Sequence, residues 1–101
     1  MTSTGSVSLS THVLDTAAGA PASGVLVVLY RGDMFMAEMR TDDDGRARLA
    51  ENLDPGSYRL VFHPPSTFFR RVEYELELDA DRHYHVPLLV SPFSCASYRG
   101  S

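Results

Sequence analysis

Four histidines are the side chains of this sequence best suited to proton transfer near neutral pH, because an unperturbed imidazole titrates at about pH 6.5. They are His12, His63, His83 and His85. On a strand, His83 and His85 would leave the same face about 7 Å apart, because they are two positions apart. The pair favours either a metal site completed by His12 or His63, or metal-free acid–base chemistry beside an arginine. The alternative for each histidine is an ordinary surface or hydrogen-bonded position.

Arg46 is a candidate for anion binding. It follows three aspartates and a glycine, residues 42–45, a pattern typical of a tight turn in which the glycine takes a positive φ. One interpretation is a solvated arginine that balances the aspartates and contributes little. The other is a guanidinium fork for a planar anion or carbonyl. The C-terminal residues 98–101 would normally fray, and could act only if they are held near a site, where Ser101 brings a hydroxyl and the terminal carboxylate together.

The hydrophobic pattern predicts strands throughout the chain. Val7, Leu9 and Val13 alternate with polar residues between positions 6 and 14, so they would share one face, while Ser8, Ser10 and His12 share the other. Further strands are predicted at residues 25–30, 34–40, 58–63, 71–78 and 83–90, with a short segment after Pro92. Pro87 lacks an N–H group, which predicts an edge or a bulge within 83–90. For residues 46–53 the pattern suggests one helical turn at most.

The predicted elements belong to one all-β domain. Seven or eight short strands with turns every 8–12 residues are typical of a sandwich, and 101 residues suffice for a single domain. We expect residues 1–5 to form a flexible N-terminus and residues 6–101 to form the sandwich.

Composition excludes several classes of chemistry and partner. All nine basic residues are arginine, which excludes a lysine Schiff base and a Walker A loop. Cys95 is the only cysteine, so an internal disulfide and a CxxC pair are excluded. Scattered basic residues and a net charge of −4 argue against nucleic acid. The sequence shows neither an apolar run of about 20 residues nor the layout of a signal peptide, which predicts a cytoplasmic protein without membrane contact.

Four segments occur in an order that is specific in combination. They are STHVLDT at residues 10–16, DGR at 44–46, HYHVPLLVSP at 83–92 and the terminal YRGS at 98–101. With these motifs the chain resembles, from about Leu9 to Ser101, the 5-hydroxyisourate hydrolases, the transthyretin-related family of urate breakdown.

The resemblance implies a transthyretin-like antiparallel β-sandwich of two four-stranded sheets. It also implies a homotetramer, a dimer of dimers, with active sites around a central channel where the dimers meet. Two departures from the family stand out. The connection His63–Arg70 is short where relatives carry a longer one with a short helix, so Phe68 or Phe69 should be partly exposed. Cys95 and Ala96 replace aromatic and hydroxyl residues, which suggests a packing role for Cys95.

The activity implied by the resemblance is hydrolysis of 5-hydroxyisourate at a cyclic amide C–N bond, giving 2-oxo-4-hydroxy-4-carboxy-5-ureidoimidazoline without metal or cofactor. The implied catalytic residues, His12, Arg46 and His85, also bind substrate together with Tyr98, Arg99, Gly100 and Ser101. One histidine would activate water and the other donate or orient a proton, and which of the two is the base stays open. The alternatives are a non-catalytic transthyretin-like small-ligand carrier and a histidine-based metal hydrolase.

Overall fold

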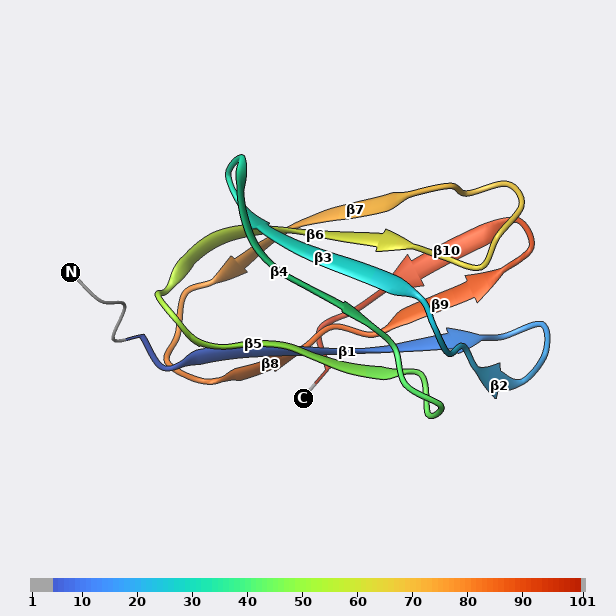
Figure 1. Ribbon diagram of the computed structural model, residues 1–101, viewed down its shortest axis with the longest axis horizontal. Coiled ribbons are helices and arrows are strands. Elements are labelled where there is room, and N and C mark those ends of the chain that lie inside the picture. Colours follow the sequence, from blue (N-terminus) through green and yellow to red (C-terminus); the bar gives the residue numbers. More distant parts are fainter. Residues whose placement is uncertain (1–4, 101) are drawn as a thin grey trace.

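The computed structural model describes residues 5–100 (Figure 1). Strands and their connections make up this part of the chain, which contains no helix and therefore none that could cross a membrane. The strands are β1 (Val7–Asp15), β2 (Ala20–Pro21), β3 (Leu26–Arg31), β4 (Met34–Arg40), β5 (Arg46–Leu53), β6 (Gly56–His63), β7 (Val72–Leu78), β8 (His83–His85), β9 (Leu88–Ser91) and β10 (Ser94–Ser97). They form two sheets that face each other across an apolar core, as the sandwich prediction required.

The first sheet is antiparallel, with the order β4-β3-β6-β7. Its inner strand β3 is the short apolar run predicted to be covered on both faces, and Val27, Val28 and Leu29 are all buried. The edge strand β7 alternates between half-buried and exposed residues until Leu78, which is buried. Its glutamates therefore point away from the core while its apolar side chains pack on it.

The second sheet is organised around β1, the longest strand. On one side β1 pairs antiparallel with β5 and then β2, and on the other it pairs in parallel with β8 and then β9. β10 pairs antiparallel with β9 and forms the far edge. Because β5 and β2 lie end to end on one side of β1, and β8 and β9 lie end to end on the other, the six strands form a sheet that is four strands wide. This agrees with the expected pair of four-stranded sheets.

The row of β8 and β9 is broken at Val86 and Pro87, where the missing N–H of proline predicted an irregularity. The Thr11 hydroxyl donates a hydrogen bond of 2.6 Å to the Val86 carbonyl. Thr11 is buried, so this bond satisfies a carbonyl at the point where regular pairing is interrupted. The chain continues from β8 to β9 across this break, and both strands pair with β1.

Residues 46–53, for which the sequence allowed one helical turn at most and predicted no strand, are extended. These residues form β5, in which Ala47 and Leu49 are buried while Arg46 and Arg48 are exposed. The alternation is lost towards the end of the strand, where the pairing with β1 shifts register and Asn52 takes a φ of 57°. That irregularity conceals the two-residue period in the sequence.

The connection after β6 contains no helix, as its shortness led us to expect. Phe68 is 65% exposed and Phe69 is half-buried. Cys95 on β10 is half-buried and packs against the core. Burial raises the pKa of the Cys95 thiol, which favours the unreactive protonated form and agrees with a packing role.

Candidate active site

The outer face of β1 carries the candidate chemistry. Its alternate residues Ser8, Ser10 and His12 are half-buried and point away from the core, as predicted, while the residues between them are buried. His12 lies opposite Arg46 of β5, and Ser10 lies opposite His85 of β8. Because paired residues of neighbouring strands share a face, the structure brings His12, Arg46 and His85 together on one side of the second sheet.

The turn between β4 and β5 positions Arg46. The Asp42 carboxylate accepts hydrogen bonds from the backbone N–H groups of Asp44, at 2.9 Å, and Arg46, at 3.0 Å. Gly45 has a φ of 76°, and its carbonyl accepts a 2.7 Å hydrogen bond from Val13. A Cβ at Gly45 would lie 2.5 Å from the Val13 carbonyl oxygen. Glycine is therefore needed both for the turn and for its close approach to β1.

His83 and His85 leave the same face of β8, as their spacing predicted. Both imidazoles contact the Ser10 hydroxyl, with Nε2 of His83 at 2.8 Å and Nδ1 of His85 at 2.9 Å. The Ser8 hydroxyl lies 2.6 Å from Nδ1 of His83. The serines of β1 and the histidines of β8 therefore form one continuous chain of hydrogen bonds.

The C-terminal segment reaches the site through Gly100. The Gly100 N–H group donates a 2.7 Å hydrogen bond to the His85 carbonyl, and the residue is buried. A Cβ at position 100 would lie 3.0 Å from Cδ2 of His85, so the absence of a side chain allows this approach. Ser101 lies outside the described residues.

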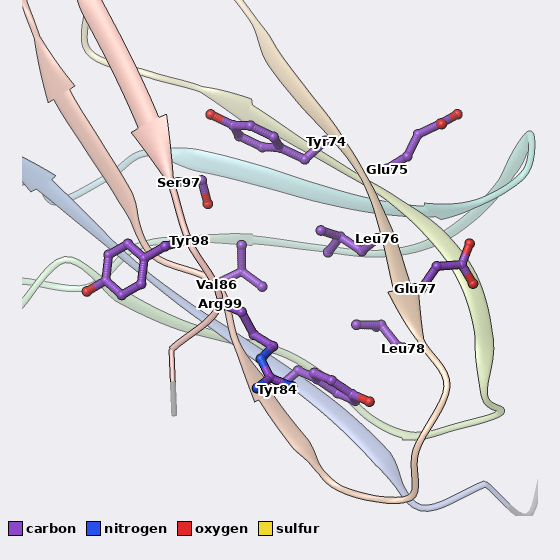
Figure 2. A pocket seen from close by; sticks show the side chains of 10 residues that line it. All are labelled: Tyr74, Glu75, Leu76, Glu77, Leu78, Tyr84, Val86, Ser97, Tyr98 and Arg99. Carbon is purple, nitrogen blue, oxygen red and sulfur yellow. The ribbon is translucent and has the colours of Figure 1, made fainter.

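Tyr98 and Arg99 line a different cleft, of about 330 Å³, between β7 and the end of β10 (Figure 2). Tyr84 and Val86 line it as well, and they lie on the core side of the chain, opposite to His83 and His85. The structure therefore brings Gly100 to the histidines but leaves the side chains of Tyr98 and Arg99 at another surface of the same chain.

The histidine face is hollowed in two adjoining places. The larger cleft has a volume of about 580 Å³ and is lined by Ser10, Thr11, Met39, Arg40, Asp42, Arg46, Ala47, Arg48, His83 and His85. A smaller hollow of about 340 Å³ is lined by His12, Leu14, Pro21, Asp44 and Arg46. Arg46 borders both, so its guanidinium can contact a ligand that extends from His85 to His12.

The surroundings of His85 disfavour its charged form. Burial is the largest cause that lowers the pKa of its imidazole, followed by repulsion from His12, Arg46 and His83. An imidazole with a lowered pKa is neutral near pH 7 and has a free lone pair for a proton. The environment therefore suits His85 to the role of a base.

The metal alternative finds no matching geometry in residues 5–100, where no three His, Cys, Asp or Glu side chains are grouped to hold an ion. His63 is exposed at the end of β6, in the other sheet, and cannot complete a site with the pair on β8.

The contacts of Ser10 with both histidines were not predicted from the sequence, and neither were Met39, Arg40 and Arg48 as residues of the cleft. A signal for Ser10 was present, since the alternation placed it on the face of His12. What was missing was the parallel pairing of β1 with β8.

The fold and the geometry define a transthyretin-like sandwich that carries histidines and an arginine on one outer face. A model of the HIUase/Transthyretin family matches residues 9–100. The chain belongs to this family.

Individual relatives agree with this assignment. The 5-hydroxyisourate hydrolase of Caulobacter vibrioides is 42% identical over 113 aligned positions, covering 92% of this chain and 97% of that protein. The structure of Klebsiella pneumoniae 5-hydroxyisourate hydrolase matches with a TM-score of 0.84 and 33% identity, over 93% of this chain and 99% of the other. Transthyretin from Sparus aurata shares the fold, with a TM-score of 0.78 and 24% identity over 91% of this chain and 95% of its own.

Proposed function

We propose that this protein hydrolyses 5-hydroxyisourate, opening its ring at a cyclic amide C–N bond in urate degradation. The observation that carries the proposal is the meeting of His12, Arg46 and His85 on one hollowed face, in a chain 42% identical to a 5-hydroxyisourate hydrolase. Transthyretins share the fold, so the fold alone would not separate an enzyme from a carrier.

In the proposed mechanism His85 is the base that activates water. Its lowered pKa supports this role, because a neutral imidazole accepts the proton that water loses on attacking the carbonyl. His12, which lines the smaller hollow on the far side of Arg46 from His85, orients the substrate and the water. The C–N bond then breaks, and the leaving nitrogen receives the proton that His85 accepted.

Arg46 binds the planar, anionic substrate through its guanidinium fork and stabilises the negative charge that develops on the carbonyl oxygen. Gly100 places the C-terminal segment against His85, and we assign Ser101 to a hydrogen bond with the substrate or a histidine. No step of this mechanism uses a metal or a cofactor.

We further propose that residues 6–101 act as one domain of a cytoplasmic homotetramer, a dimer of dimers. In this assembly Tyr98 and Arg99 would lie at a subunit contact, because in their own subunit they line the cleft away from the histidines. Leu88 and Val90 are unavailable for subunit contacts, since both are buried in the core of their own subunit. Leu89 is the outward-facing residue between them.

The test is to mix the purified protein with freshly prepared 5-hydroxyisourate and follow the loss of its ultraviolet absorbance against the spontaneous rate. His85→Ala should lose the acceleration, whereas His63→Ala, a matched histidine change on the other sheet, should retain it. A carrier would bind the compound without accelerating its loss. Activity that disappears with a chelator and returns with zinc would instead identify a metal hydrolase.

A further inference from the structure

The chain of hydrogen bonds from Ser8 to His85 is more extensive than the hydrolytic mechanism requires. It runs from Ser8 to Nδ1 of His83, from Nε2 of His83 to Ser10, and from Ser10 to Nδ1 of His85, at 2.6, 2.8 and 2.9 Å. His83 is exposed and His85 is half-buried. The chain therefore connects a half-buried histidine with an exposed one, and both line the larger cleft.

Counting protons shows that the two histidines are coupled. A serine hydroxyl has one proton to donate, and each ring nitrogen of a neutral histidine is either a donor or an acceptor. Ser10 can therefore donate to only one of the two imidazoles, although its two lone pairs can accept from both. If both bonds form, at least one of the two ring nitrogens that face Ser10 must carry a proton.

Two of the arrangements that satisfy every bond in the chain differ in the direction of each bond. In the first, Nδ1–H of His85 donates to Ser10, Ser10 donates to Nε2 of His83, and Nδ1–H of His83 donates to Ser8. Nε2 of His85 then has a free lone pair. In the second, every bond is reversed, and Nε2 of His85 carries a proton. Reversing the two bonds of Ser10 converts His85 from a proton acceptor to a proton donor while His85 itself stays neutral.

We propose that Ser10 is a positioning residue that couples the tautomer of His85 to that of His83, so that His85 serves in turn as base and acid. The proposal rests on the hydrolytic function proposed for His85. It adds Ser10 and His83, which line the same cleft as His85, to the machinery of the site.

The proton transfers balance over one turnover. His85 takes a proton from water at Nε2, its Nδ1 proton passes to Ser10, and the Ser10 proton passes to Nε2 of His83. Hydroxide attacks the carbonyl carbon while His83 carries the positive charge. When the C–N bond breaks, His85 gives its Nε2 proton to the leaving nitrogen, and the two other transfers reverse. The net reaction adds water across the bond.

The surroundings disfavour a positive charge on His85. The groups around His85 are His12 of β1, Arg46 of β5 and His83 of its own strand, and all of them disfavour a cation there. Arg48, opposite Ser10 on β5, is paired with Glu51 at 3.0 Å. The His83 side chain is exposed, so water can solvate a positive charge on it.

Steady-state kinetics of Ser10 and His83 variants test the coupling of His85 to His83, provided that the wild-type protein hydrolyses 5-hydroxyisourate. Ser10→Ala should lower kcat by about tenfold or more with KM nearly unchanged, because His85 loses the group that sets its tautomer. Ser10→Thr should restore most of the rate, since it returns the hydroxyl. His83→Ala should have a similar effect, and the double variant Ser10→Ala/His83→Ala should be no slower than either single variant. Ser57→Ala, which removes a serine–glutamate bond on the other sheet, is the matched control and should keep full activity.

A measurement independent of turnover separates this proposal from the proposed function. Nitrogen-15 NMR of the imidazoles should show that His83→Ala changes the Nδ1 protonation of His85 when Ser10 is present, and has no such effect in Ser10→Ala. An unchanged His85 tautomer in folded His83→Ala would overturn the coupling, as would additive losses in the double variant. A wild-type protein that fails to hydrolyse 5-hydroxyisourate would overturn the proposed function, and the NMR result would still decide the coupling.

Discussion

Replacing Gly100 with alanine adds one methyl group directly against the proposed base. The added Cβ would lie 3.0 Å from Cδ2 of His85 and 3.1 Å from its carbonyl oxygen. Carbon atoms in favourable contact are about 3.5–4.0 Å apart. The imidazole or the tail must therefore move by about half an ångström, while the hydrogen bond from the position 100 N–H to the His85 carbonyl can be kept.

The size of the effect follows from this displacement. A misplacement of about 1 Å in an active site can lower the rate about 100-fold, so half of that distance corresponds to roughly a tenfold loss in kcat. The change removes no buried apolar group and no hydrogen bond, so the free energy of unfolding should fall by less than about 1 kcal/mol. We therefore expect Gly100→Ala to affect activity and to spare stability.

Gly24→Ala provides the opposite control. Gly24 has a φ of 73° with no atom within 4 Å of a built Cβ, so alanine there should cost about 1 kcal/mol of stability through backbone strain and leave kcat unchanged. The assay is steady-state loss of 5-hydroxyisourate absorbance, with thermal unfolding of each variant measured alongside. Gly100→Ala with wild-type kcat, or with a rate loss explained by unfolding, would refute the reasoning that tail packing positions His85.

Three further predictions use the same assay. His12→Ala and Arg46→Ala should each lower turnover about 100-fold or more with folding intact, since they remove groups that contact the reacting atoms; near-normal rates would contradict the assigned roles. Because the pKa of His85 is lowered from 6.5, the acidic limb of kcat/KM should have its midpoint below pH 6.5. The unfolding free energy should also fall as the pH drops from about 6.5 through that lowered pKa, since the unfolded chain binds the proton more tightly. A kcat/KM midpoint above pH 6.5 would contradict the lowered pKa of His85. Deleting residues 98–101 should abolish most activity and weaken the proposed tetramer without unfolding the sandwich, as turnover and light scattering would report; full activity would exclude a role for the tail.

The strands whose two-residue period is regular could be predicted from the sequence. β1 and β7 alternate clearly, and the apolar run of β3 is covered on both faces as expected. β5 was missed because its alternation is lost near Asn52, where a positive φ and a shift in register interrupt it. Local patterns identify strands only while the pairing stays regular.

The sequence grouped His12, Arg46 and His85 as candidates, and the structure brings these three to one face, whereas it leaves Tyr98 and Arg99 at another cleft. Alternation placed Ser10 with His12, and it placed His83 with His85, but it could not show that these two faces adjoin. That requires the pairing of Ser10 with His85 across 75 positions of sequence, and a one-residue change of register would have separated them. For the same reason the attachment of Gly100 to His85 could not be inferred from the motif YRGS alone.

The pairing of β1 with β8 and β9 also has a consequence for synthesis and refolding. The first strand of the chain completes its sheet only with residues 83–91, so until these are available one edge of β1 lacks its partner. An unpaired strand edge with an apolar face is a site of aggregation, and pairing between distant segments is slow. Recovery of activity after dilution from denaturant should therefore coincide with the last refolding phase. Expression at lower temperature should raise the yield of soluble protein.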